Sequence, residues 1–254
     1  AQVARWFGWE SDSLQAEVDY IFFDHATADE ATHTIQFEGV NDRFELTADG
    51  AGSRLRVVRS APADGTAWTD VYEDMTEGWI MFVQQLKFGL EKEGLAPRRT
   101  LWLSLPKGER ESQRPLAALG LAELTTGHVG DAVSRALPTG DTVSGNLWHV
   151  SKYQVAVTVD AWAGLLNVHD AGSWTSGGGH GPGMVMITAY GLDDDAFAEL
   201  EGRWKAGGTE RESAGPPGPL EERHDRRPLR LRLRQHRRGH ARGDGGADRR
   251  QCRD

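Results

Sequence analysis

The first residues that could take part in acid–base catalysis lie in a short stretch near the amino end. Two histidines and three carboxylates lie within ten positions: Asp24, His25, Asp29, Glu30 and His33. Imidazole and carboxylate groups within hydrogen-bond reach of a substrate can exchange protons with it. The same residue types are common in solvated turns, and this stretch is polar throughout. We interpret the cluster as a turn and assign no catalytic residue to it.

Three further histidines raise the question of a metal site. His149, His169 and His180 share the second half of the chain with Asp160 and Asp170. No pair has the compact spacing of metal ligands, such as two histidines four positions apart on a helix. We therefore interpret these histidines as ordinary surface or loop residues and expect no metal.

The sequence also lacks the motifs typical of nucleotide binding and of nucleophilic catalysis. Residues 176–183 are rich in glycine, but they have neither the Gly-Lys-Ser/Thr ending of a phosphate loop nor the Rossmann order before a helix. A Gly-x-Ser-x-Gly nucleophile motif is absent, and the one cysteine, Cys252, lies near the carboxyl end. We predict a hairpin loop over 176–183, no cofactor and no nucleophile.

One long helix carries the strongest periodic pattern, and its side chains are the candidates for a ligand site. Apolar residues recur at spacings of three and four over residues 70–93, which is typical of one helix face. Thr69 or Asp70 can begin this helix, and Gly94 ends it. The stripe itself is Val71, Met75, Trp79, Phe82, Leu86 and Leu90. The alternatives are core packing and the lining of a cavity, for which the candidates are Tyr72, Met75, Trp79, Phe82, Gln85 and Leu86.

Alternating apolar and polar residues predict the sheets that must cover this helix. Between residues 16 and 59 the period is two, with turns at Gly39, Asn41-Asp42 and 49–52, which predicts an antiparallel meander. A short strand over 100–105 and a helical turn over 116–124 follow. A second set of strands is predicted at 147–150, 154–160, 165–168 and 184–189, before a helix that begins near Asp193. Both halves thus place strands before a closing helix, a weak internal repeat, and the predicted fold class is α+β.

The composition changes sharply near residue 206. All 9 Trp, 8 Phe and 4 Tyr lie before this point, and the last 48 residues hold 13 Arg and 8 acidic residues. The first 206 residues carry 16 basic and 30 acidic side chains, a net charge of −14 against −9 for the whole chain. We expect residues 207–254 to be a disordered tail, either native or translated in a shifted reading frame. If the tail is genuine, its arginines could bind nucleic acid; otherwise we expect no such partner.

Several stretches in both halves carry a family resemblance: residues 3–9, the helix from Glu77-Gly78-Trp79 to Leu90, and in the second half 145–148, 155–160, 164–166 and 189–204. Together they resemble the Activator of Hsp90 ATPase homologue family of the START/Bet v 1-like (SRPBCC) superfamily. The resemblance covers about residues 1–206. It implies a helix-grip fold, in which a curved antiparallel sheet wraps a long helix around an elongated cavity, and a second, partial unit as in some bacterial members.

We therefore expect four parts: a helix-grip domain over 1–96 that lacks its first element, a mixed connecting segment over 97–145, a smaller unit over 146–206, and the tail over 207–254. The expected function is non-catalytic binding of a small hydrophobic ligand, or assistance to a protein partner of the chaperone type. The alternatives are a polyketide-cyclase-like enzyme and an Hsp90-type co-chaperone that activates the ATPase. No apolar run is long enough to span a membrane, and we expect a cytoplasmic protein.

Overall fold

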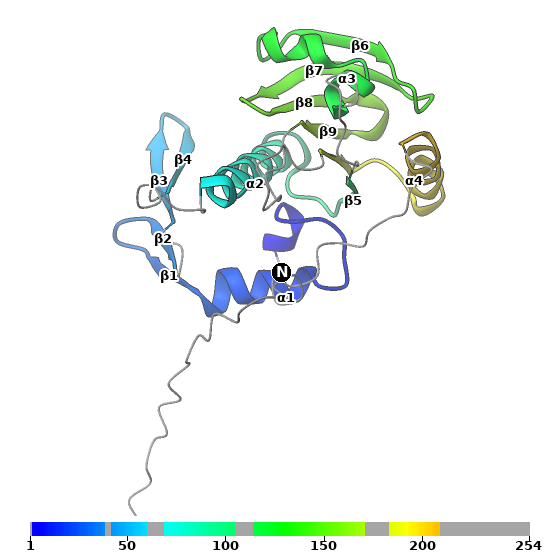
Figure 1. The fold of residues 1–254 in the computed structure, drawn as a ribbon. Coiled ribbons are helices and arrows are strands. Elements are labelled where there is room, and N and C mark those ends of the chain that lie inside the picture. Colours follow the sequence, from blue (N-terminus) through cyan, green and yellow to red (C-terminus); the bar gives the residue numbers. More distant parts are fainter. Residues whose placement is uncertain (1, 39–41, 60–68, 105–113, 171–182, 209–254) are drawn as a thin grey trace, which may run out of the picture. The chain divides into compact units, whose positions relative to one another are not determined.

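The computed structural model describes residues 2–38, 42–59, 69–104, 114–170 and 183–208, all within one compact unit that spans Ala1–Ala214 (Figure 1). The predicted α+β class is confirmed, because these residues form two separate antiparallel sheets together with helices. The predicted loop over 176–183 and the predicted tail over 207–254 lie outside the described residues, apart from residues 183, 207 and 208. The predicted domain boundaries at 96 and 146 stay predictions.

The first sheet is the predicted meander, but it begins later than the pattern indicated. Ile35, Phe44 and Val57 lie opposite one another on neighbouring strands and share one apolar face. Polar and charged residues such as Arg43 and Glu45 occupy the other face, as expected for a sheet with one buried side. Its strands, in order across the sheet, are β1 (Ala26–Asp29), β2 (Thr34–Phe37), β3 (Arg43–Asp49) and β4 (Gly52–Val58).

The strand pattern predicted from residue 16 is wrong for its first part, which is helical. Helix α1 (Leu14–Asp19) continues into the π-helical turn η2 (Tyr20–Asp24). Its apolar residues are spaced three and four apart, so a helix buries them together where a strand would split them between two faces. They pack with Trp6 and Phe7, next to the short helix η1 (Val3–Arg5), in a cluster that includes Val18, Ile21 and Phe22.

The predicted long helix is confirmed as α2 (Thr69–Phe88) followed by the π-helical turn η3 (Gly89–Glu93). Gly94 ends it in a left-handed conformation with φ of 58°. Leu90, predicted to continue the apolar stripe, is 58% exposed. The wider turn of a π-helix rotates the residues that follow it relative to the α-helical stripe, so position 90 leaves the buried face.

A buried ion pair joins α2 to the first sheet. Arg59 Nε donates to Asp42 Oδ2 at 2.9 Å, and both side chains are buried. The indole N–H of Trp79 on α2 donates to the same carboxylate oxygen at 3.3 Å, and Arg59 also donates to the hydroxyl of Thr76. The backbone carbonyl of Asp42 accepts the N–H of Phe37 at 2.8 Å. Sheet and helix are thus linked through one carboxylate.

The second sheet combines the strands predicted between residues 100 and 189 with one further strand and part of another. The predicted segments 147–150, 154–160, 165–168, 184–189 and 100–105 are all confirmed as strands. Strand β6 and the first half of β7 were not predicted, and both fall in the segment predicted to be a mixed connection. The order across the sheet is β5 (Arg99–Ser104), β10 (Met184–Ala189), β9 (Gly164–His169), β8 (Gln154–Val159), β7 (Thr142–Val150) and β6 (Ala132–Ala136).

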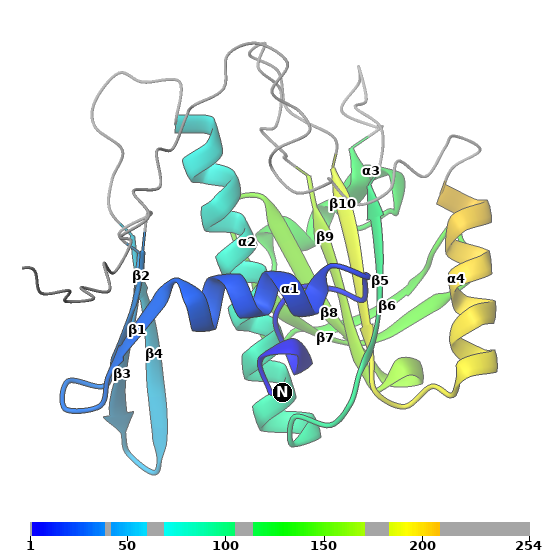
Figure 2. The ribbon, with the colours of Figure 1, turned by 90° about the horizontal axis from the view of Figure 1, so that it is seen from below.

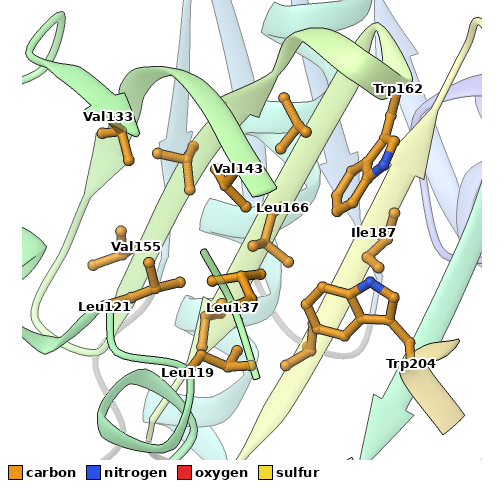
Figure 3. Close-up of a cluster of buried hydrophobic side chains, with 14 of the residues drawn as sticks. Leu119, Leu121, Val133, Leu137, Val143, Val155, Trp162, Leu166, Ile187 and Trp204 are labelled. Carbon is orange, nitrogen blue, oxygen red and sulfur yellow. The ribbon is translucent and has the colours of Figure 1, made fainter. Parts of the chain in front are cut away.

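One face of the second sheet bears the larger apolar core (Figure 3). Trp162 and Trp204 meet edge to face, with ring centroids 6.2 Å apart, beside Leu166 and Ile187 from the strands. The elements that cover this face are α3 (Pro115–Ala118), η5 (Ala122–Thr126), η6 (Asp160–Trp162) and α4 (Asp194–Gly208). Helices α2 and α4 lie against opposite faces of the sheet (Figure 2).

Two positions in the strands require glycine, because the backbone of a neighbouring strand occupies the space that a Cβ atom would need. A Cβ on Gly164 would lie 1.9 Å from the carbonyl oxygen of Thr188, and one on Gly145 would lie 2.0 Å from that of Thr158. Such contacts are far below van der Waals distance, so the strands would have to separate. Both glycines therefore hold their neighbouring strands at close range.

We expect Gly164→Ala to lower the free energy of unfolding by about 1–3 kcal/mol, the usual range for overpacking. Gly202 on α4 is the matched control, because a Cβ there would meet nothing within 4 Å. Gly202→Ala should leave stability unchanged or raise it by about 0.5–1 kcal/mol, since alanine is the better helix former. Urea unfolding of both variants measures the difference, and equal effects would contradict the close approach.

Candidate functional site

Helix α2 presents two buried stripes, and the predicted ligand-site residues divide between them. Trp79, Phe82 and Leu86 pack against the first sheet and the amino-terminal segment. Phe82 lies 4.6 Å from Phe7 between ring centroids, and Trp79 contacts Phe44 at 5.0 Å. These three residues are therefore part of an apolar cluster, whose rings are Trp6, Phe7, Phe22, Phe37, Phe44, Trp79 and Phe82.

The remaining predicted residues lie elsewhere. Met75 is half-buried near the start of α2, and the side chain of Tyr72 lies outside the described part of the structure. Gln85 faces the second sheet, away from Phe82 and Leu86. The structure thus brings Trp79, Phe82 and Leu86 together and separates Gln85 from them.

The second stripe is more deeply buried and contains polar residues. Glu77, Met81, Gln85 and Phe88 repeat at intervals of four, four and three, and each is at most 7% exposed. They face the second sheet, whose strands present alternating polar side chains on that side. We call this layer the polar seam and define it as Glu77, Gln85, Gln154, Asn167, His169 and Thr188.

At one end of the polar seam, Glu77 accepts hydrogen bonds from β8 and the turn before it. Gln154 Nε2 donates to the Glu77 carboxylate and to the Glu77 backbone carbonyl, both at 2.7 Å. The hydroxyl of Ser151 donates to the same carboxylate oxygen at 3.1 Å. The orientation of the Gln154 amide is thereby fixed, because its NH₂ faces two oxygens.

At the other end, Gln85 joins three elements. The hydroxyl of Thr188 on β10 donates to Gln85 Oε1 at 2.8 Å, and the guanidinium of Arg98 donates to the same oxygen. Arg98 also donates to the backbone carbonyls of Phe7 and Gly8, at 2.9 and 2.8 Å. Burial lowers the pKa of Arg98 to about 10, against the opposing effect of Tyr190 and Glu10. Arg98 thus remains charged at neutral pH and holds the amino-terminal segment against α2.

Between these ends lie buried polar atoms that have no hydrogen-bond partner among the described residues. They are Gln154 Oε1, Asn167 Oδ1 and His169 Nε2. Gln154 lies directly opposite His169 in the β8–β9 register, and Asn167 is two residues before His169, so all three side chains share one face. Gln154 is 1%, His169 2% and Asn167 5% exposed. Three adjacent orphaned groups therefore face α2.

Burial sets the charge state of this part of the seam. It lowers the pKa of His169 to about 4, so the imidazole is neutral at physiological pH. The pKa of His149 on β7 is also lowered, by burial and by the positive charge of Lys87. Burial raises the pKa of Tyr190, whose hydroxyl also has no hydrogen-bond partner within the described residues. The arrangement can donate and accept hydrogen bonds but offers little acid–base chemistry near neutral pH.

The other residues that the sequence suggested for acid–base or metal chemistry do not come together in one site. His25 faces Glu38 at 3.8 Å on the surface, and Asp29 accepts the N–H of Ala31 and the hydroxyl of Thr32, which lowers the pKa of Asp29. The predicted turn is therefore confirmed only for residues 30–33, because Ala26–Asp29 form strand β1. His180 and Cys252 lie outside the described residues. Within the described ranges, no group of three His, Cys, Asp or Glu side chains could hold a metal.

A separate hollow of about 480 Å³ lies beside α4. Its lining includes Trp162, Leu192 and Leu200, and its mouth carries an ion pair in which Arg203 donates to Asp141 at 2.9 Å. None of the predicted ligand-site residues lines it. Glu199 also lines the hollow and is not part of that ion pair, so the wall combines apolar side chains with charged ones.

Sequence reasoning missed most of the polar seam. It considered Gln85 as a ligand contact, but not Glu77, Gln154, Asn167 or Thr188. The interpretation of His169 as a surface or loop residue is wrong, because His169 lies in strand β9 and is 2% exposed. Strand β9 itself was predicted, and within it Asn167 and His169 alternate with Leu166 and Val168, which indicates one polar face. The alternation does not indicate that this polar face is buried.

Comparison with known proteins gives little further guidance. No protein-family model matches the chain, and no curated protein matches it. Among solved structures, the chain is similar to DynU16, a protein of the dynemicin biosynthetic locus, at 17% identity and a TM-score of 0.22, over 67% of this chain and 68% of that one. Within the described residues, no helix is both long and apolar enough to cross a membrane.

Proposed function

We propose that this protein binds a small, mainly apolar ligand between α2 and the second sheet, with the polar seam as its polar contact. One observation carries the proposal: Gln154, Asn167 and His169 place three orphaned polar atoms on one buried face. Leaving a buried polar group unpaired costs about 1–3 kcal/mol. A protein retains such groups where something else satisfies them, and a ligand with matching polar groups would do so.

The proposal includes the helix-grip arrangement expected from the family resemblance, with α2 as the gripped helix. Assignment to the Activator of Hsp90 ATPase homologue family is part of this proposal and rests on the residues quoted for it. Binding is favoured over catalysis because the histidine of the seam is a weak base, with a pKa of about 4. A polyketide-cyclase-like enzyme, an Hsp90-type co-chaperone and a cytoplasmic location stay predictions.

The test is to fill the seam without removing a polar group. Ala156 on β8 lies directly opposite Asn167 and is completely buried. We expect Ala156→Leu to weaken binding of the uncharged fluorescent probe N-phenyl-1-naphthylamine at least about tenfold, because the larger side chain would stand between α2 and the second sheet, where the proposed ligand lies. Fluorescence titration of the full chain gives the affinity, and native mass spectrometry detects any small molecule that co-purifies with it.

Ala136→Leu is the control, because Ala136 lies exposed on β6. This substitution adds the same leucine side chain at a position away from the seam. Circular dichroism of both variants shows whether the fold survives. Probe binding that is equal in the original chain and in Ala156→Leu would place the probe elsewhere and reject the proposed site. Absence of both probe binding and a co-purified molecule would reject ligand binding itself.

A further inference from the structure

The polar seam has a fixed hydrogen-bond polarity at Gln154. Its NH₂ group donates to two oxygens of Glu77, both at 2.7 Å. Rotating the amide by 180° would bring its oxygen against those same two oxygens, so this orientation is the one that hydrogen bonding allows. Gln154 Oε1 is therefore an acceptor that lacks a donor among the described residues.

Asn167 offers a second acceptor beside the first. Its Oδ1 is buried and lacks a partner within the described ranges. The residue opposite it on β8 is Ala156, whose short side chain provides no polar atom, and on β10 it is Met186, whose sulfur accepts from Gln85 Nε2 at 3.7 Å. The vacant positions of the seam thus include two amide oxygens, which need a donor from outside the chain, beside the orphaned His169 Nε2.

The charges around these oxygens disfavour an ionised ligand. The Glu77 carboxylate already accepts from Gln154 and Ser151, and a second carboxylate placed near it would be repelled. Arg98 contacts the seam through Gln85 and is also engaged by the carbonyls of Phe7 and Gly8. The Glu77 carboxylate would attract an ammonium group, but one of its oxygens already accepts two hydrogen bonds, from Gln154 and Ser151. The vacant amide oxygens are neutral and repay little of an ammonium group's lost hydration.

We infer that the ligand is uncharged and presents hydroxyl groups as hydrogen-bond donors to Gln154 Oε1 and Asn167 Oδ1. This inference rests on the proposed function and narrows its substrate class. A site built to bind a hydroxyl group discriminates strongly against an analogue that lacks it, because its own polar groups then stay unpaired.

Four naphthalene derivatives of similar size test the inference by displacement of N-phenyl-1-naphthylamine from the full chain at pH 7.5. They are 2-naphthol, 2-methylnaphthalene, 2-naphthoate and 2-naphthylmethylammonium. We expect 2-naphthol to bind at least about tenfold more tightly than each of the other three. If the probe binds in an Ala156-dependent manner but 2-naphthol shows no such advantage, the inference is wrong while the proposed function stands. If the probe does not bind at all, the proposed function itself fails.

A substitution at Asn167 then tests whether this residue accepts the hydrogen bond from the ligand. Asn167→Leu should abolish the preference for 2-naphthol over 2-methylnaphthalene without lowering the melting temperature, because no hydrogen bond of the described structure is lost. Asn146→Leu, the same exchange at an exposed position on β7, should keep the preference. A preference that survives Asn167→Leu would overturn the assignment of this acceptor. A large fall in melting temperature would show that Asn167 has a structural role instead.

Discussion

Replacing Arg59 by methionine will lower the free energy of unfolding by about 3–5 kcal/mol, the range measured when one partner of a buried ion pair is removed. The Asp42 side chain is 1% exposed, so its carboxylate cannot recover water when the guanidinium is lost. The indole N–H of Trp79, at 3.3 Å, is then its remaining side-chain donor in the described structure. The cost therefore comes mainly from an uncompensated buried charge. Urea unfolding followed by tryptophan fluorescence measures it.

The surface pair of Arg54 and Asp49 provides the control. Its nitrogen and oxygen are 2.8 Å apart, similar to the buried pair, but the two side chains are 70% and 55% exposed. Arg54→Met should cost at most about 1 kcal/mol, because water screens and solvates both groups. In the double variant Asp42→Leu/Arg59→Met, part of the loss should be recovered, since the orphaned charge is gone. A similar loss for Arg59→Met and Arg54→Met would show that Asp42 is solvated.

Acidification from pH 6.5 to 4 will lower the stability by about 3 kcal/mol through His169 alone. Its pKa is about 4 in the folded chain against an ordinary value of 6.5. Within this window the unfolded chain binds a proton at His169 and the folded chain does not, so protonation favours unfolding. The contribution to stability is complete above pH 6.5 and is lost as the pH falls towards 4. Burial of His149 acts in the same direction.

His169→Phe isolates this effect, because phenylalanine fills similar space and cannot bind a proton. Urea unfolding at pH 7.5, 6, 5 and 4.5 should show a smaller pH dependence for this variant than for the original chain. His128 is the control, since its side chain is 91% exposed. His128→Gln should leave the pH dependence unchanged. An identical slope in the original chain and His169→Phe would mean that the imidazole is accessible to solvent protons.

Periodicity predicted most of the elements. Alternation identified β2, β3, β4, β8, β9 and β10, and spacings of three and four identified α2 and α4. The failure at residues 16–24 arose because Val18, Tyr20 and Phe22 alternate with other residues as in a strand, whereas the apolar residues that the helix buries are Val18, Ile21 and Phe22. Strand β6 was missed because most of its side chains are exposed, and only Val133 is buried. A strand with one apolar residue carries almost no periodic pattern.

The candidate site was much less predictable than the elements. The apolar stripe of Trp79, Phe82 and Leu86 is the stronger pattern on α2, and it led to a cavity hypothesis on that face. The stripe that contains Glu77 and Gln85 is more deeply buried, although these two residues are of types typical of a solvated face. Burial of polar residues depends on what lies opposite them, and here that is the polar face of β8 and β9.

The sequence by itself determined the α+β class, the amphipathic first sheet and the position of the long helix, because these follow from local patterns of apolar residues. Only the tertiary structure decided which residues meet in the polar seam. Gln154 and Glu77 are 77 positions apart, and Thr188 and Gln85 are 103 apart. Contacts between such distant residues depend on strand register and on which face of the sheet α2 covers. Neither is encoded in a local period, so the orphaned oxygens that support the proposed function could be identified only in the folded chain.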